Sequence, residues 1–408
     1  MRSRFFADQR GGVAPIFALG LVPMIGMAGA AIDYSRASAA RTAMQATLDS
    51  AALMVAKDAQ TIPPAQVNSV ATNYFNAAFD RPDVQSLQVT ASIGNGPNGG
   101  TTVTASATGS VSTTFMHMLG RSSMAVAVRA SVTNANDGLG CVLSLNPAAA
   151  GAATAQGSTT VNLNGCSLYD NSKNDTALTV GGSATVHADF VGVAGGVGST
   201  SGITATNGIR THITPVQDPY ADVPAPTYSG CDQHNYTAKN TVTINPGVYC
   251  GGIGTNANAV LTLNPGLYIL NGGGLTVNGG ATVNGDGVTL YITSSNGNSW
   301  AGVTINGNAN VNLTPMTSGN TRGMVVFADR NTPQGTSFKF NGGANQYFAG
   351  AIYVPTGALQ FSGGANTLTT CTQVIGDTVT FTGNSNLAID CSRYNTRPFS
   401  SKTMRLSS

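Results

Sequence analysis

The sequence contains no glutamate, so all 17 of its acidic residues are aspartates. Charged residues make up only 9% of the 408 residues, against roughly a quarter in an average soluble protein. The basic residues are scattered and not gathered beside aromatic ones, which argues against a nucleic-acid partner. Hydrolysis of glycosidic bonds, which usually takes two carboxylates, would have to rely on aspartates alone.

Motifs for metal ions, cofactors and phosphate are missing as well. There is no CxxC pair, and no two histidines stand at ligand spacing; they are His117, His187, His212 and His234. The glycine run Gly272–Gly274 is not followed by the Lys-Ser/Thr pair of a phosphate-binding loop. We therefore expect no metal site, no cofactor, no catalytic residue and no enzyme activity.

Glycine, asparagine, threonine and valine are abundant instead, with 51 glycines in the chain. Valine and threonine favour strands, whereas glycine and asparagine favour turns. Alternation of the two groups predicts many short strands joined by tight turns. The expected fold class is mainly β, with helices only towards the N-terminus.

One apolar segment without charge, residues 11–32, is long enough to cross a membrane. As a helix it would span about 33 Å, which covers the hydrocarbon core. The positive-inside rule, applied to Arg2, Arg4 and Arg10, predicts a cytoplasmic tail at residues 1–10 and the rest of the chain on the far side of the membrane.

A cleaved secretory signal peptide is the alternative interpretation of this segment. Ala28, Gly29 and Ala30 resemble a small-x-small cleavage site. Signal peptides have apolar regions of about 7–15 residues, shorter than this one. The length therefore favours a permanent single-pass anchor.

Residues 33–82 are expected to continue the helix as a stalk beyond the membrane. An apolar stripe at helical spacing is formed by Met44, Leu48, Ala51 and Val55. Pro63 and Pro64 interrupt the helix. Either the stripe pairs with another helix, as small neighbouring alanines would allow, or it packs on its own domain.

Residues 83–136 alternate between apolar and polar side chains, for example at Leu87, Val89 and Ala91. The glycine- and asparagine-rich turn at residues 94–100 predicts a hairpin. Such alternation suits an antiparallel sheet with one buried face. We expect a small membrane-proximal α+β module.

Residues 137–395 carry a short repeat, an apolar residue followed by a polar-Gly-Gly/Asn turn. Its five copies begin at Val277, Ile305, Phe340, Phe361 and Phe381. A second motif, Asn-Pro-Gly-apolar-Tyr, starts at Asn245 and again at Asn264. A period near 20 residues predicts a parallel β-solenoid (β-helix) with asparagine ladders between its coils. Residues 396–408 are expected to form a C-terminal tail.

Six cysteines occur, all in this β-rich body: Cys141, Cys166, Cys231, Cys250, Cys371 and Cys391. An even number of widely spaced cysteines on an exported domain suggests disulfides, although six cysteines allow 15 pairings. Cysteines one coil apart would stack within disulfide reach. The hypothesis is Cys371 with Cys391, Cys231 with Cys250, and the remaining pair together.

The proline-rich segment at residues 214–226 lacks the repeat and is expected to be a loop. Its Asp218 and Asp222 could bind a cation or a sugar, although aspartates in such segments more often cap turns. Asp329 and Arg330 are expected to form an internal ion pair. The lone Trp300 is weak support for stacking on sugars.

The apolar segment and its surroundings resemble the N-terminal region of the TadG-like proteins of Tad/Flp pilus assembly (TadE/TadG-like). The resemblance rests on Gly12-Val13-Ala14, Ile16-Phe17-Ala18-Leu19, Asp33-Tyr34 and Asp49-Ser50-Ala51-Ala52-Leu53. The anchor residues of the family motif are Gly12, Phe17, Asp33, Tyr34, Asp49, Ala52 and Leu53. Related pilin-like proteins carry a glutamate near the start of the apolar run, and its absence here favours a permanent tether over a processed filament subunit.

The resemblance implies a non-enzymatic protein of the bacterial cytoplasmic membrane, associated with Tad/Flp pilus assembly, anchoring or surface attachment. The partners it implies are the bilayer, other pilus or envelope proteins, and surface glycans. It also implies a β-helical body, periplasmic or extracellular. The alternatives are an anchored carbohydrate-binding adhesin and an anchored polysaccharide-active enzyme.

Overall fold

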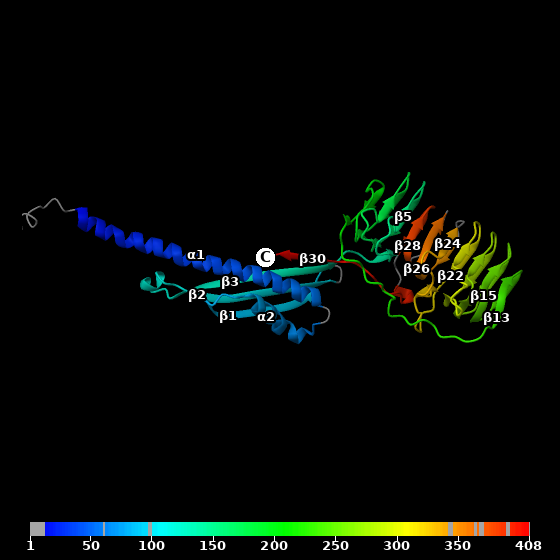
Figure 1. Cartoon of the computed structure of the whole chain (residues 1–408), viewed down its shortest axis with the longest axis horizontal. Coiled ribbons are helices and arrows are strands. Elements are labelled where there is room, and N and C mark those ends of the chain that lie inside the picture. Colours follow the sequence, from blue (N-terminus) through cyan, green and yellow to red (C-terminus); the bar gives the residue numbers. More distant parts are fainter. Residues whose placement is uncertain are drawn as a thin grey trace, which may run out of the picture. The chain divides into compact units, whose positions relative to one another are not determined.

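The structure, a computed structural model, describes residues 13–59, 62–96, 100–341, 346–362, 365–366, 371–388 and 392–407. They divide into two compact units, which are described separately (Figure 1). Unit 1 runs to Asn136 and takes up the chain again from Lys402, and unit 2 comprises Asp137–Ser401. As predicted, the protein is mainly β with one long apolar helix near the N-terminus.

Unit 1 is an antiparallel sheet of four strands covered by helices. The strand order is β1-β2-β3-β30. The helical elements are α1 (Val13–Asp58), η2 (Pro64–Gln66), α2 (Val67–Ala78) and η4 (Met116–Leu119). The strands are β1 (Val84–Asn95), β2 (Thr101–Ser112), β3 (Ser123–Asn136) and β30 (Lys402–Ser407).

The apolar stripe of α1 packs on the sheet of its own unit. Met44, Leu48 and Val55 are completely buried, in one cluster with Val103 of β2 and Val128 of β3. Of the two interpretations of the stripe, the structure therefore shows the second. The alternation predicted for residues 83–136 has the same cause, since every second side chain of β2 points into this core.

The prediction of a C-terminal tail at residues 396–408 is wrong. β30 pairs antiparallel with β3 along its whole length, and Asn136 lies directly opposite Lys402. Unit 2 is therefore inserted between two neighbouring strands of the unit 1 sheet, and both of its ends are tied to that sheet.

Unit 2 consists of two runs of short strands. The first run contains β4 (Gly140–Ser144), β5 (Ala153–Ala155), β6 (Thr160–Asn164), β7 (Ser167–Asp170), β8 (Leu178–Val180), β9 (Thr185–Ala188), β10 (Val191–Val193), β11 (Ile203–Ala205) and β12 (Ile209–Arg210).

The second run begins with β13 (Gln233–Ala238), β14 (Thr241–Ile244), β15 (Gly247–Thr255), β16 (Val260–Leu263), β17 (Gly266–Asn271), β18 (Leu275–Val277), β19 (Thr282–Gly285), β20 (Val288–Thr293) and β21 (Val303–Ile305). It continues with β22 (Asn310–Leu313), β23 (Met324–Ala328), β24 (Ser337–Asn341), β25 (Gln346–Phe348), β26 (Gly350–Ser362), β27 (Ala365–Asn366), β28 (Thr372–Phe381) and β29 (Ser385–Ala388).

All strand pairings among the described residues of unit 2 are parallel, as predicted, but the strands do not stack in sequence order. The longest sheet begins with the order β12-β10-β7-β4-β28-β26-β23-β20-β17-β15 and continues with β18-β21-β24. β4, near the start of the unit, therefore lies beside β28, near its end, with Val142 opposite Val374. Residues of both runs share one buried core. A simple solenoid, in which each coil rests on its predecessor in the sequence, would not place these two strands side by side.

The repeat copies identified in the sequence are direct register partners. Val277 pairs with Ile305, Ile305 with Phe340, Phe340 with Phe361, and Phe361 with Phe381. The last three rings stack, with centroids 5.0 and 5.6 Å apart. Each repeat therefore places its apolar residue on the same column of the core.

Asparagine side chains at successive turns pair with each other at two places, although each contact joins only two residues and is shorter than the predicted ladder. Asn264 donates from Nδ2 to Oδ1 of Asn245 at 2.7 Å, and Asn306 donates to Asn278 at 3.1 Å. Parallel stacking brings equivalent turn residues above one another, so their amides pair.

The two runs are joined by residues 211–232, here called the crossover segment. It leads from β12, at one end of the longest sheet, to β13, which pairs with β15. In Figure 1 it is the long green loop that runs along unit 2. It has no regular secondary structure, in keeping with the predicted loop, but Val216, Tyr220 and Val223 are buried against outward-facing side chains of the sheet.

Candidate functional site

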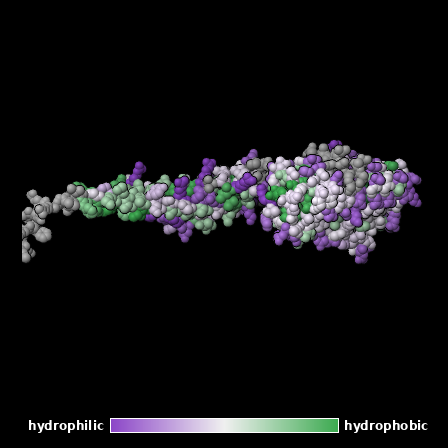
Figure 2. Space-filling model, turned by 90° about the horizontal axis from the view of Figure 1, so that it is seen from above, coloured by the Kyte–Doolittle hydropathy of each residue, from purple (hydrophilic) through white to green (hydrophobic). Residues whose placement is uncertain are grey.

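The first part of α1 carries large apolar side chains that face solvent. They include Phe17, Leu19, Val22, Met24, Ile25, Met27 and Ile32. Figure 2 shows hydrophobic surface along this stretch of helix. α1 is long and apolar enough to cross a membrane, judged by length and composition. Exposure of so much apolar surface to water is unfavourable, and this stretch is therefore the candidate membrane anchor.

The family-motif residues divide into an exposed and a buried group. Phe17, Tyr34 and Leu53 are exposed, whereas Ala52 is buried against the sheet of unit 1. Asp49 accepts a hydrogen bond from the Gln45 side chain of the same helix at 2.7 Å. Gly12 lies outside the described residues.

Asp33, another residue of this motif, joins α1 to the turn between β2 and β3. Its carboxylate accepts the backbone N–H groups of Thr114, Phe115 and Met116 at 2.7–2.9 Å. Beside it, Nη1 of Arg36 donates to Oγ1 of Thr114 at 3.2 Å. The carboxylate thus satisfies amides at the start of η4, in the manner of a helix cap.

These contacts set the ionisation of Asp33, which follows the apolar segment directly. The N–H of Met116 holds the pKa of the carboxyl below its usual 3.8; burial opposes this, and the amides of Thr114 and Phe115 and the Arg36 charge add to it. The ionised form is therefore the one that fits the folded turn. Sequence reasoning identified Asp33 only as a motif residue, because its three partners lie in a turn with no recognisable pattern.

Asp218 and Asp222, the candidates for binding a cation or a sugar, hold the crossover segment in place. Asp218 accepts the hydroxyl of Tyr353 at 2.7 Å and the N–H of Tyr220 at 2.9 Å. Asp222 forms an ion pair with Arg397. Their carboxylates are thus committed to contacts within unit 2.

The predicted ion pair between Asp329 and Arg330 is wrong, because the two side chains serve different elements. Asp329 accepts from the hydroxyls of Tyr291 and Thr293 at 2.7 and 2.8 Å. Arg330 donates to the carbonyl oxygens of Tyr220 and Val223 in the crossover segment. Adjacent residues at the end of a strand point in different directions, so neighbours in sequence are poorly placed to pair.

Burial and hydrogen bonds together set the pKa values of Tyr220 and Asp329. Burial raises the pKa of Tyr220 to about 12, and its hydroxyl accepts the N–H of Arg397 at 3.1 Å. Burial also acts to raise the pKa of Asp329, but the hydrogen bonds from Asn331, Tyr291 and Thr293 outweigh it and hold the pKa below the usual value. At neutral pH Tyr220 is therefore uncharged and Asp329 is ionised, which suits their roles as structural hydrogen-bond partners.

Two of the three predicted disulfides are present in the structure. Cys141 is bonded to Cys166 and Cys231 to Cys250, each with Cα atoms 5.7 Å apart. Cys371 is also disulfide-bonded, and Cys391, the partner predicted for it, lies outside the described residues.

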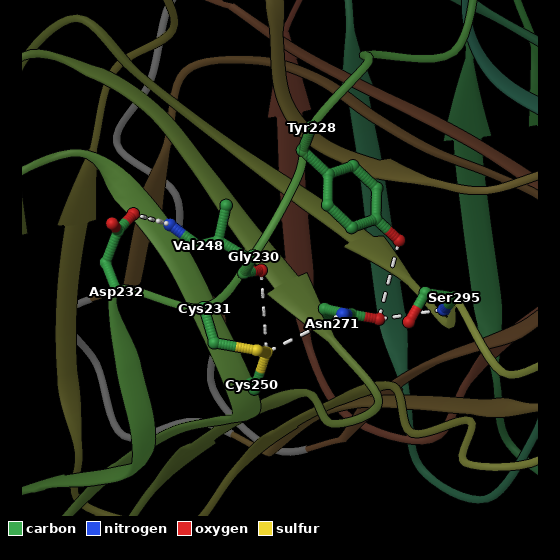
Figure 3. The surroundings of a disulfide bond; sticks show 8 residues. All are labelled: Tyr228, Gly230, Cys231, Asp232, Val248, Cys250, Asn271 and Ser295. Carbon is green, nitrogen blue, oxygen red and sulfur yellow. Dashed lines mark hydrogen bonds between the residues drawn. A yellow bond between two sulfur atoms is a disulfide. The ribbon is translucent and has the colours of Figure 1, made fainter.

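The Cys231–Cys250 disulfide fastens the end of the crossover segment to β15 (Figure 3). On one side of it the Asp232 carboxylate accepts the N–H of Val248 at 2.7 Å. On the other side the hydroxyl of Tyr228 lies 3.4 Å from Oδ1 of Asn271. The segment is thus held at successive points across the sheet.

His234 is the histidine nearest to a possible ligand set, since it lies with the sulfurs of Cys231 and Cys250 within 4.8 Å. Both sulfurs are in a disulfide, and metal binding by cysteine requires the thiolate. This group therefore does not form a metal site in its oxidised state. His117, His187 and His212 are exposed and far apart in the sequence.

Comparison with known proteins gives one match. Residues 11–58 match the family model described as putative Flp pilus-assembly TadE/G-like. The N-terminal region of the chain is thus Tad-like, and the match covers the apolar segment and the part of α1 that packs on the sheet of unit 1. No curated protein and no solved structure matches the chain.

Proposed function

We propose that this protein is a membrane-anchored, non-enzymatic component of a Tad/Flp pilus-assembly system, in which α1 tethers unit 2 to the outer side of the cytoplasmic membrane. The observation that carries the proposal is the coincidence of the Tad-like region, residues 11–58, with the solvent-facing apolar stretch of α1. The positive-inside rule supports this orientation, because Arg2, Arg4 and Arg10 precede the apolar segment.

The role we propose for unit 2 is display of a stiff surface for another pilus or envelope protein. We interpret its parallel stacked turns as a β-solenoid whose two halves meet at β4 and β28. Three features support stiffness: the shared core, the asparagine pairs and the crossover segment fastened by Arg330 and the Cys231–Cys250 disulfide. Because both ends of unit 2 join neighbouring strands of unit 1, force on it would reach the anchor through two connections.

A deletion strain would test the proposal, scored for pilus assembly and for surface attachment. Complementation would use the full chain, a variant without residues 137–401, and a variant without residues 11–32. Asn136 and Lys402 are opposite each other, so a short Asn-Gly turn can join them while β30 stays in the sheet.

We expect the full chain to restore both readouts and the variant without the apolar segment to restore neither. The variant without unit 2 should reach the membrane but fail in assembly or attachment. Normal pili and normal attachment in the deletion strain would overturn the proposal.

A further inference from the structure

The turn between β2 and β3, residues 113–122, holds two large apolar side chains in the open. Met118 is 84% exposed and Leu119 is 71% exposed. The turn is built to hold this shape. Gly120 takes a left-handed conformation, with φ of 83°, and its N–H donates to the carbonyl of His117 at 3.0 Å.

This turn is fixed to α1 at the end of the apolar segment. The Phe115 ring lies so close to Gly29 that a Cβ at this position would stand 2.5 Å from it. Four residues further along α1, Asp33 accepts the three amides of the turn. The turn therefore cannot leave the helix without losing both contacts.

The attachment point determines the depth of the turn relative to a bilayer. Gly29 lies within the apolar segment, about 6 Å along the helix axis before Asp33. A bilayer that covers residues 11–32 would thus have its outer boundary at the base of the turn. Apolar side chains at this level lie in the interfacial region, where amphipathic elements bury their apolar faces.

We propose that Met118 and Leu119 insert into the bilayer interface beside α1, so that unit 1 contacts the membrane at two points. The partner is the lipid surface itself. Continuity with the exposed apolar stretch of α1 carries this choice. A second contact would fix the tilt and rotation of unit 1, which a single helix leaves free.

Charge contributes little to this contact. Arg36 and Arg121 lie at this end of the sheet, but so do Asp80 and the Arg81–Asp83 ion pair at the start of β1. We therefore attribute the contact to apolar insertion, and we expect it in vesicles of phosphatidylcholine without anionic lipid.

The test is lipid quenching of tryptophan in the full chain reconstituted into phosphatidylcholine vesicles. Trp300 is first replaced by phenylalanine, which leaves no other tryptophan. Met118→Trp is then compared with Met54→Trp, a matched exposed methionine on α1. Met54 lies about 33 Å along the helix from Ile32, far from the bilayer boundary. The quencher is phosphatidylcholine brominated near the glycerol end of its acyl chains.

We expect severalfold stronger quenching, with blue-shifted emission, for Met118→Trp than for Met54→Trp. Equal and weak quenching of the two variants in vesicle-bound protein would overturn the inference and would point to a protein partner for the turn. The inference rests on the anchoring proposed above, and flotation of the same samples tests that separately. A chain that does not float with vesicles would overturn the anchor itself.

Discussion

The carboxylate of Asp33 accepts the backbone N–H of Met116 at 2.7 Å, although 83 residues separate the two in the chain. This bond and its two neighbours connect the end of the apolar segment to the sheet of unit 1. A free helix could swivel, whereas the end of this apolar segment is fixed to the sheet of its own unit.

Asp33→Asn should loosen the turn between β2 and β3. Asparagine keeps the size of the side chain but loses the charge and one acceptor oxygen. We expect hydrogen exchange of the Thr114–Met116 amides to accelerate about tenfold, because charge-assisted hydrogen bonds are the stronger ones. Asp49→Asn is the matched control, since its carboxylate accepts from a side chain of its own helix. Unchanged exchange in Asp33→Asn would contradict the role of the carboxylate.

The same amides should lose protection in acid. The Met116 N–H, with the other two amides, holds the pKa of Asp33 below 3.8, so the ionised form stabilises the folded state. The stabilisation is fully present above the unfolded-state pKa and is lost as the pH falls through the lower folded-state pKa. Exchange measured from about pH 5 downwards should show this loss in the natural chain and not in Asp33→Asn. Parallel curves for the two proteins would rule out Asp33 as the titrating group.

Arg330→Ala should detach the middle of the crossover segment. The carbonyl oxygens of Tyr220 and Val223 would lose their donor. We expect the free energy of unfolding of unit 2 to fall by about 1–3 kcal/mol and protease cleavage within residues 211–232 to increase. Arg322→Ala, at an exposed position, should change the free energy by less than about 0.5 kcal/mol. Similar effects of the two substitutions would mean that Arg330 does not hold the segment.

The two described disulfides should differ in their accessibility to reductants. Both cysteines of the Cys141–Cys166 pair are fully buried, whereas Cys231 is exposed and Cys250 half-buried. A mild reductant applied to the folded protein should therefore open Cys231–Cys250 first. Alkylation followed by peptide mass mapping gives the order. Prior opening of Cys141–Cys166 would contradict the packing described for the first run of strands.

Phe361→Ala should destabilise unit 2 strongly. The Phe361 ring is buried and stacked between Phe340 and Phe381. Its removal leaves a cavity in the column, and we expect a loss of about 3–5 kcal/mol in the free energy of unfolding by denaturant. Gln360→Ala, at the neighbouring half-buried position, should cost less than about 1 kcal/mol. A comparable loss in both variants would show that the ring stack does not support the fold.

Local patterns in the sequence predicted the parts of this fold that depend on period and composition. The apolar segment, the alternation in β2, the stacking of the repeat copies and the Cys231–Cys250 disulfide all follow from spacing along the chain, whereas Cys141–Cys166 was expected only as the remaining pair. Stacked turns repeat the same environment, so equal residues at equal spacing must meet. The copies at Phe340, Phe361 and Phe381 are the clearest case.

Pairings between strands far apart in the chain cannot be predicted from such local patterns. No period indicates that β4 lies beside β28, or that β30 completes the sheet of unit 1, because an edge strand accepts any chain segment of suitable length and register. The partners of single charged side chains are equally hidden from the sequence. Asp329 and Arg330 contact different elements because neighbouring side chains at a strand end point in different directions. The partners of Asp218 and Asp222, Tyr353 and Arg397, lie 135 and 175 residues away in the chain.

Three features of the chain can be recognised without its fold: a membrane-length apolar segment, a Tad-like region at residues 11–58 and a repetitive β-rich body. These are properties of composition and spacing, which act locally. Folding is needed to show that Asp33 fastens the end of the apolar segment to the turn at Met116, and that Asn136 and Lys402 enclose unit 2 between neighbouring strands. Those contacts join residues far apart in the chain, and they form only when each unit has folded around its core.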